Sequence, residues 1–441
     1  MKDLIQPVLK EKILAAVETA LPELTPREVR VPVIPGKAMV VIGMRRSGKT
    51  SFLHQRRSEL IAEGRSPESL VYFNFEDERL AGLDAARLGL IPEMHLRLFP
   101  DSPSEPVTFF LDEIQTVPGW ETFARRLLDE GCYELFLSGS SAKLLSREIA
   151  TSMRGRGWEI VIHPFSFREW LRHHKHEIPN DAGKLTRRRA VQVDRQFNEW
   201  LTTGGFPEAQ GLSSVDQRQL LQGYVDVLLL RDVIERHGVS NVTALRWMVR
   251  RLLGNPGGLF SITKFEADLK SQGVAAGRET LYELLDHLED AFLLQAIPVA
   301  TDSEKRRQVN PRKIYPVDTA LGPVFDRSGK ANLGHALEVA VHGELCRRGA
   351  EIAYVKTADG FEVDFLSRGA EGAQELILVC ADPDGPDTLD REVRALESAA
   401  KEHSVERQLI LTASSRLLFP EVPRSIEVLP AWQWMLEAVP R

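Results

Sequence analysis

The sequence predicts an α/β fold whose first part is a doubly wound parallel sheet, and three observations support this class. Short apolar runs typical of buried strands recur at 38–42, 70–75, 107–112 and 134–137, with a fifth at 159–162. Segments with helical spacing separate these runs. Carboxylates or hydroxyl groups directly follow several of them. Because the carboxyl ends of parallel strands meet at one edge of a sheet, we expect a ligand site at that edge.

The composition of the chain limits the classes of function that it can have. The hydrophobic share of 43% and the charged share of 27% are those of ordinary globular proteins. The formal net charge is −7, so the chain as a whole is not expected to bind polyanions, and any nucleic-acid contact must come from a local patch. Cys132, Cys346 and Cys380 show no metal-ligand spacing, and their odd number favours a reducing compartment. Without a long apolar stretch or a signal-like N-terminus, the chain is expected to be cytoplasmic.

A glycine-rich segment at 43–50, GMRRSGKT, follows the first apolar run and opens a helical pattern at 48–63. It matches G-x-x-x-x-G-K-[ST] at every fixed position, in the strand–loop–helix context that this motif requires. Its glycines let backbone N–H groups point at phosphate oxygens, its lysine supplies a charge for the outer phosphates, and its threonine can ligate Mg²⁺. The residues predicted to contact the nucleotide are Gly43, Arg45, Arg46, Ser47, Gly48, Lys49, Thr50 and Ser51.

The apolar run VTFFLD ends in Asp112, and Glu113 follows it. A carboxylate at a strand end can hold the Mg²⁺ shell, and its neighbour can polarise the attacking water. Downstream of a complete phosphate loop, this pair indicates ATP hydrolysis. We therefore expect Thr50 and Asp112 to bind Mg²⁺ and Glu113 to activate the water.

Three further residues are catalytic candidates. Ser138 ends the strand at 134–137, where a hydroxyl can contact the γ-phosphate or the attacking water, although helix capping by neighbouring serines is an alternative. Arg154 and Arg156 stand in the segment SMRGR. An arginine there can stabilise transition-state charge in its own chain or in a neighbouring subunit, or the two can form a surface pair. The acidic segment 76–78 either faces the nucleotide or forms a solvated loop.

The segment 172–190 is polar and basic, as an exposed connection would be. It contains His173, His174 and His176, three potential metal ligands. No second cluster has matching ligand spacing, so a solvated loop is favoured over a metal site.

After helical patterns at 220–236 and 242–253, residues 260–298 read as helix, turn, helix and strand, which is the winged-helix arrangement. Its second helix would read DNA, but here that helix carries five acidic residues against one arginine. Phosphate repulsion therefore favours packing against protein over DNA reading. A better basic patch for DNA, in the place of the wing, consists of Lys305, Arg306, Arg307, Arg312 and Lys313.

Several motifs together resemble a family of bacterial and archaeal ATPases that have an AAA-type N-terminal domain and a C-terminal domain of unknown function. In chain order these motifs are GMRRSGKT, FFLDEIQTVPGWE, LSGSSAKLLSREIATSMRGR, PFSFREWL, TGGFPEA, GFEVDFLS and ELILVCA. The resemblance implies ATP and Mg²⁺ as ligands and ATPase activity. It implies no particular cellular process, because the role of that family is largely uncharacterised.

The C-terminal part resembles the core of restriction-endonuclease-like nucleases. In those proteins a helix glutamate, a strand aspartate and an acid-x-lysine triple assemble one metal site. Glu338 and Asp364 match the first two, but Leu378 and Cys380 stand where the triple should fall. Glu362 and Glu375 are spare carboxylates that do not restore the lysine. The resemblance therefore implies an inactive nuclease-like fold with a vestigial site.

The predicted organisation has an AAA-type P-loop ATPase domain with an N-terminal helix at 1–171, a helical lid and winged-helix-like segment at 172–330, and a nuclease-like mixed α/β domain at 331–441. The preferred function is Mg²⁺-dependent ATP hydrolysis that drives or switches a domain rearrangement, on DNA or on a protein partner, in a monomer or an oligomer. The alternatives are an ATP-regulated, metal-dependent nuclease and a non-catalytic ATP-binding switch that recruits a partner.

Overall fold

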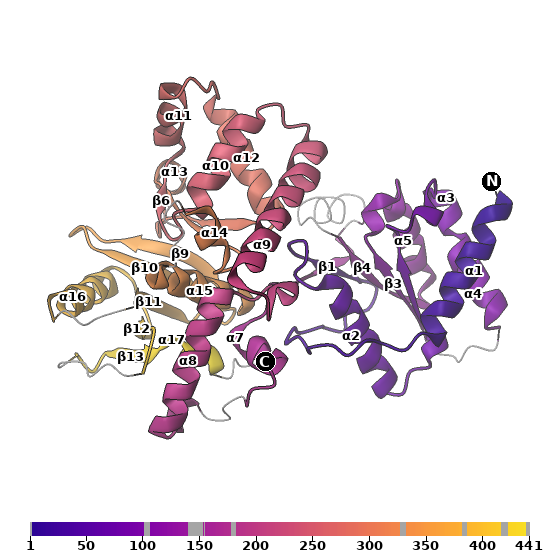
Figure 1. The fold of residues 1–441 in the computed structure, drawn as a ribbon, viewed down its shortest axis with the longest axis horizontal. Coiled ribbons are helices and arrows are strands. Elements are labelled where there is room, and N and C mark those ends of the chain that lie inside the picture. The colour runs from indigo at the N-terminus through magenta and orange to yellow at the C-terminus, as the bar shows by residue number, and fades with distance from the viewer. Residues whose placement is uncertain are drawn as a thin grey trace. The chain divides into compact units, whose positions relative to one another are not determined.

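A computed structural model of the chain describes residues 2–100, 106–139, 153, 155–177, 182–326, 332–381, 386–415 and 422–437 (Figure 1). The chain divides into two compact units, Met1–Ile162 and His163–Arg441. Over the described ranges, no helix combines the length and the apolar character needed to cross a bilayer.

The first unit is built on a five-stranded parallel sheet with strand order β2-β3-β4-β1-β5, as the apolar runs predicted. Its strands are β1 (Ala38–Ile42), β2 (Leu70–Asn74), β3 (Val107–Asp112), β4 (Tyr133–Ser138) and β5 (Gly157–Val161). Its helices are α1 (Lys2–Glu18), α2 (Lys49–Ala62), α3 (Ala85–Leu88), α4 (Leu90–Leu98) and α5 (Trp120–Glu130). All five residues of β1 are buried, which is why this strand reads as a continuous apolar run.

The second unit begins with a helical region followed by a small antiparallel sheet of order β6-β8-β7. The helices are α7 (Phe167–His173), α8 (Arg187–Thr203), α9 (Ser214–Leu228), the π-helix η6 (Leu229–Glu235), α10 (Val242–Leu253), α11 (Ile262–Ser271), α12 (Arg278–Asp290) and α13 (Glu304–Val309). The strands are β6 (Leu259–Phe260), β7 (Leu294–Ile297) and β8 (Arg312–Pro316). In the chain, α11 and α12 stand between β6 and β7, and α13 stands between β7 and β8.

The unit ends in a five-stranded mixed sheet of order β13-β12-β11-β10-β9. Along the chain, the first strand pairs antiparallel with the second and the second with the third. The third then pairs parallel with the fourth and the fourth with the fifth. These strands are β9 (Glu351–Lys356), β10 (Glu362–Arg368), β11 (Gln374–Cys380), β12 (Arg407–Thr412) and β13 (Ile426–Pro430). The helices α15 (Leu333–Arg347), α16 (Pro386–Glu402) and α17 (Ala431–Leu436) pack on this sheet, whereas α14 (Leu321–Phe325) packs against α9 and α10.

A buried aspartate joins two distant segments of the second unit, around 205 and 318–320. Asp318 accepts hydrogen bonds from the backbone N–H groups of Gly205, at 2.7 Å, and Ala320, at 3.0 Å. Burial raises the pKa of Asp318 to about 6. A Cβ on Gly205 would lie 2.3 Å from the carbonyl oxygen of Phe165, so the turn TGGF needs glycine there. The motifs PFSF and TGGF are thus explained by packing.

Candidate nucleotide site

The phosphate loop connects β1 to α2, and its backbone enters the left-handed region at three positions. Gly43 has φ 144°, Arg46 has φ 65° and Gly48 has φ 102°. A Cβ on Gly43 would lie 2.3 Å from the carbonyl oxygen of Ile162. Glycine is therefore required at position 43 both for its φ angle and for the close approach of the neighbouring chain.

Lys49 lies over this loop. The residue is buried, with 6% exposure, and its ammonium donates to the carbonyl oxygens of Gly43, at 3.0 Å, and Met44, at 3.2 Å. Ser47 is fully buried, and its hydroxyl oxygen has no hydrogen-bond partner. Arg46, Thr50 and Ser51 are exposed. The loop thus holds one ammonium group and one unsatisfied hydroxyl group at the start of α2, where helix N–H groups favour phosphate.

Arg27 supports the loop from the segment that precedes β1. Its guanidinium donates to the carbonyl oxygen of Ser47 at 2.9 Å. Its backbone exchanges hydrogen bonds with the side-chain amide of Gln55 on α2, at 2.7 and 3.1 Å. Sequence reasoning missed this arginine, because nothing in the local pattern marks a residue 20 positions before its contact.

Three hydroxyl groups surround the carboxylate of Asp112 at the carboxyl end of β3. Thr50 donates to Oδ2 at 2.7 Å, Tyr72 of β2 donates to the same oxygen at 2.8 Å, and Ser138 of β4 donates to Oδ1. Burial, and then the charge of Asp112, raise the pKa of Tyr72 well above its ordinary value, so Tyr72 remains a donor. The structure thus brings Thr50, Asp112 and Ser138 together as expected, and it adds Tyr72, which sequence reasoning missed.

Glu113 adjoins this cluster with a backbone φ of 54°, in the left-handed region. Its N–H donates to the hydroxyl of Ser138 at 3.2 Å, and its carboxylate accepts a hydrogen bond from the side chain of Gln115. Burial raises the pKa of Glu113, against an opposing effect of Lys49. The carboxylate is therefore a stronger base than an exposed glutamate, as a residue that activates water should be.

Arg156 lies at the other end of β1, so a role for it in the nucleotide site of its own chain must be corrected. Its carbonyl oxygen accepts a hydrogen bond from the N–H of Ala38, the first residue of that strand, at 2.8 Å. Its guanidinium pairs with Asp129 of α5. The phosphate loop follows the last residue of β1, so the length of that strand separates Arg156 from the loop. A role in a neighbouring subunit stays a prediction, and Arg154 lies outside the described residues.

The acidic segment 76–78 after β2 was expected either to face the nucleotide or to form a solvated loop, and its residues differ in this respect. Asp77 pairs with Lys12 of α1, at 2.7 Å, and with Arg79, at 2.9 Å, so its role is structural. Glu76 is exposed, but it lies close enough to Glu113 to raise the pKa of that carboxyl.

The oxygen atoms of Thr50 and Asp112 fit an Mg²⁺ ion bound with a nucleotide. A hydroxyl and a carboxylate 2.7 Å apart are hard oxygen ligands of the kind that Mg²⁺ takes beside substrate phosphates. The unsatisfied hydroxyl of Ser47 and the ammonium of Lys49 add donors for phosphate oxygens.

The predicted nuclease-like residues also meet, but around a lysine that sequence reasoning assigned elsewhere. The ammonium of Lys313 lies 3.3 Å from Glu338, 2.9 Å from Glu362 and 2.8 Å from Asp364. The side chain of Lys313 is 4% exposed, so it cannot contact DNA as part of the basic patch. This corrects two expectations, because the carboxylate site does contain a lysine, supplied by β8.

The interior of this carboxylate cluster is closely packed. The hydroxyl of Tyr315 donates to Glu338 at 2.6 Å, and the ring of His342 stacks on the ring of Tyr315 with centroids 4.4 Å apart. Burial and Asp364 raise the pKa of Glu338 to about 7, against opposing effects of Lys313 and Tyr315. Burial lowers the pKa of Lys313, but Asp364 and Glu338 outweigh it and raise that pKa. Lys313 therefore stays charged.

The rest of the predicted basic patch is partly paired. Arg307 lies 3.7 Å from Glu351, and Arg312 lies 3.9 Å from Glu289 of α12. Lys305 and Arg306 are exposed on α13. The patch that faces solvent is thus smaller than the sequence suggested.

The three histidines near 173–176 belong to a group of ring contacts, in which His173 contacts Phe165 and the other two contact Trp170. His174 lies 4.3 Å and His176 5.7 Å from that indole, measured between ring centroids. Over the described ranges these histidines do not form a group with metal-ligand geometry.

Comparisons with known protein families agree with the geometry of the first unit. A family model described as an AAA domain matches residues 35–171, and a model of a domain of unknown function (DUF8612) matches residues 194–329. The first unit is therefore an AAA-type P-loop ATPase domain, and the region that follows it matches a domain without an assigned function.

Two curated relatives extend this result over most of the chain. An uncharacterised protein of Methanocaldococcus jannaschii is 32% identical over 421 residues, which cover 93% of this chain and 90% of the relative. An uncharacterised protein of Haemophilus influenzae is 32% identical over 334 residues, which cover 75% and 80%. The chain belongs to the same family as these two proteins.

Solved structures are more distant. A Walker-type ATPase of Pyrococcus abyssi has 14% identity and a TM-score of 0.40, with 73% of this chain and 95% of that chain covered. The Orc1 protein of Aeropyrum pernix, solved in complex with DNA, has 14% identity and a TM-score of 0.25, with 74% and 91% covered. At these TM-scores the likenesses carry no argument about function.

Proposed function

We propose that the first unit binds ATP with Mg²⁺ and hydrolyses it. The observation that carries this proposal is the array at the carboxyl edge of the sheet. There Asp112 accepts hydrogen bonds from Thr50 and Ser138, and Glu113 adjoins it. A loop that only binds phosphate needs no second carboxylate beside the first. An enzyme that hydrolyses ATP needs one to orient the attacking water.

Each residue of the array then has a separate task. Lys49 and the N–H groups of the loop bind phosphate oxygens, and Thr50 and Asp112 hold Mg²⁺. When bound, Mg²⁺ neutralises charge on the phosphate groups. Glu113 accepts the proton of the attacking water, while Ser138 fixes the carboxylate of Asp112 and the backbone of Glu113. Tyr72 keeps the second oxygen of Asp112 oriented.

The pH profile of ATP turnover tests the role of Glu113. This carboxylate must be ionised to accept a proton, and burial raises its pKa above that of an exposed glutamate. Turnover should therefore be complete above that raised pKa and fall as the pH is lowered through it, at a higher pH than the ordinary value of about 4.3. Phosphate release is measured from about pH 4 to pH 9, together with ATP binding at each pH. Full turnover at the acidic end would contradict the role.

We further propose that ATP hydrolysis changes the arrangement of the second unit on a partner. The connectivity of α10, β6, α11, α12, β7 and β8, with sheet order β6-β8-β7, supports a winged-helix segment. The acidic surface of α12 favours a protein partner, whereas Lys305 and Arg306 on α13 offer a small contact for DNA. Measuring ATP turnover with and without duplex DNA distinguishes a DNA partner from a protein partner. Added DNA should change the rate if DNA is the partner and leave it unchanged if the partner is a protein.

A second candidate function, an ATP-regulated nuclease, is favoured by the position of Lys313 between Glu338, Glu362 and Asp364. The opposing argument is geometric. The ammonium lies among oxygens that Mg²⁺ would need at about 2.0–2.1 Å, so the lysine and the ion compete for one place.

Plasmid DNA incubated with Mg²⁺ or Mn²⁺, with and without ATP, decides this candidate. We expect no cutting, because Lys313 already neutralises part of the carboxylate charge. Cutting by the wild-type chain that is lost in Asp364→Ala would establish the nuclease instead.

A further inference from the structure

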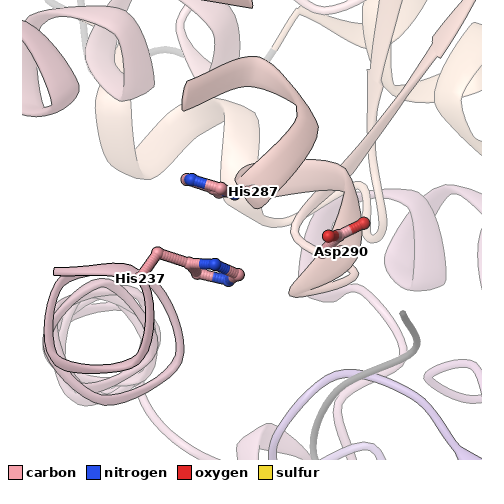
Figure 2. Close-up of side chains that lie close together, drawn as sticks. All are labelled: His237, His287 and Asp290. Atoms are coloured by element: carbon pink, nitrogen blue, oxygen red, sulfur yellow. The ribbon is translucent and has the colours of Figure 1, made fainter. Parts of the chain in front are cut away.

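Two histidines and an aspartate of the second unit gather outside the sites described above. They are His237, His287 and Asp290, and one ligand atom from each lies within 4.8 Å of the others (Figure 2). Asp290 is buried, and the two histidines are half-buried. Over the described ranges, no other group of three or more histidines, cysteines, aspartates or glutamates has this arrangement.

Two helices bring these side chains together. His287 and Asp290 are three residues apart in α12 and therefore share one face of that helix. His237 comes two residues after the end of the π-helix η6, at the end of the helical segment that begins with α9. A π-turn holds an extra residue and so changes the direction of the side chains that follow, and such turns occur often at functional sites. Gly238, with φ 63°, then ends this helical segment.

The surroundings favour a cation. His287 and Asp290 occupy the last turn of α12, and His237 occupies the last turn of its own helical segment. The carboxyl end of a helix carries partial negative charge, so two negative helix ends meet at this place. The same helix α12 carries further acidic residues, which are Glu279, Glu283, Asp286 and Glu289.

The donor atoms indicate which cation. Two imidazole nitrogens and one carboxylate oxygen form a set that suits Zn²⁺ and its neighbours Co²⁺ and Ni²⁺. Mg²⁺ prefers a set made of oxygens, such as Thr50 and Asp112 provide. The two sites of the chain should therefore select different ions.

The present side-chain positions are close to ligation geometry without having reached it. The two imidazole rings stack, with centroids 3.7 Å apart and planes at 13°. Zinc ligands at about 2.0–2.1 Å from the ion stand about 3.3–3.5 Å from one another in a tetrahedron. Ligation therefore requires one ring to turn out of the stack, toward Asp290.

We propose that His237, His287 and Asp290 bind one divalent transition-metal ion of the zinc type. The ion ties the end of the helical segment containing η6 to α12, with water in the remaining coordination position. None of its ligands belongs to the first unit, so its test needs neither ATP nor Mg²⁺.

The test is a Co²⁺ titration of the full chain, purified without a histidine tag and stripped with a chelator, followed by visible absorption. We expect one equivalent of Co²⁺ to bind, to be displaced by Zn²⁺, and to be unaffected by millimolar Mg²⁺. Mutating a residue that only hydrogen-bonds to a metal ligand typically lowers metal affinity by about 10–100-fold. Removing a ligand itself, in His287→Gln or Asp290→Asn, should therefore weaken Co²⁺ binding at least that much.

Two matched variants serve as controls. His403→Gln changes another half-buried histidine of the same unit, and Asp112→Asn removes the predicted magnesium ligand; both should bind Co²⁺ as the wild type does. Zn²⁺ should raise the melting temperature of the wild type but not of His287→Gln, and the two metal-free proteins should melt alike. Failure of the wild type to bind Co²⁺ stoichiometrically, or equal binding by His287→Gln, would overturn the proposal.

Discussion

Replacing Glu113 by glutamine is expected to slow ATP turnover by about 10²–10⁴-fold, the usual contribution of a positioned general base. Glutamine has nearly the same shape, and its amide oxygen can still accept the hydrogen bond from Gln115. The site should therefore keep its structure and lose only the group that accepts the proton of water. ATP binding, measured by equilibrium titration, should stay close to that of the wild type.

Glu76→Gln is the matched control for this variant. Glu76 is an exposed acid after β2, near enough to Glu113 to influence its pKa but outside the hydrogen-bonded array. Its replacement should leave turnover within a small factor of the wild-type rate. If Glu113→Gln also turned over at that rate, another group would have to orient the water.

Replacing Lys313 by methionine is expected to destabilise the second unit by about 3–5 kcal/mol, because breaking a buried ion pair leaves uncompensated charge. Three carboxylates lie within 3.3 Å of this ammonium, and the variant would leave them facing one another. The loss should appear as a lower urea midpoint for the transition of the second unit. Lys305→Met, which changes an exposed lysine, should leave that midpoint nearly unchanged.

A second substitution distinguishes charge from packing in this cluster. Adding Asp364→Asn to Lys313→Met removes one of the stranded carboxylates, so the double variant should recover part of the lost stability. If the midpoint of Lys313→Met equalled that of the wild type, the lysine would not be the counter-ion of the cluster.

The parallel sheet and the phosphate loop were predictable because their signals are local. The loop residues from Gly43 to Thr50 are consecutive, and Asp112 follows an apolar run whose strand direction places it at the same edge. Tyr72 and Arg27 could not be found in the same way. The hydroxyl of Tyr72 and the guanidinium of Arg27 reach the site from other segments of the chain. Neither residue belongs to a sequence motif that would mark it as part of a nucleotide site.

Other sites depended on pairings that a sequence does not display. Lys313 read as one of a run of surface cations, and only the packing of β8 beside β10 and α15 turns it inward. His237 lies 50 positions before His287, so their spacing resembles no ligand motif. Arg156 shows the reverse case, since its place in the segment SMRGR suggested a catalytic role, but the structure places it at the amino end of β1, away from the phosphate loop of its own chain.

The most direct measurement of the central proposal is phosphate release from ATP by the wild-type chain and by Lys49→Ala, each with Mg²⁺ and with EDTA. The ammonium of Lys49 is fixed on the loop by the carbonyl oxygens of Gly43 and Met44, at 3.0 and 3.2 Å. We predict steady release by the wild type with Mg²⁺ and loss of release in EDTA and in Lys49→Ala. Release by Lys49→Ala at the wild-type rate would contradict an ATPase site in this loop, and ATP binding without release by the wild type would favour a non-catalytic switch.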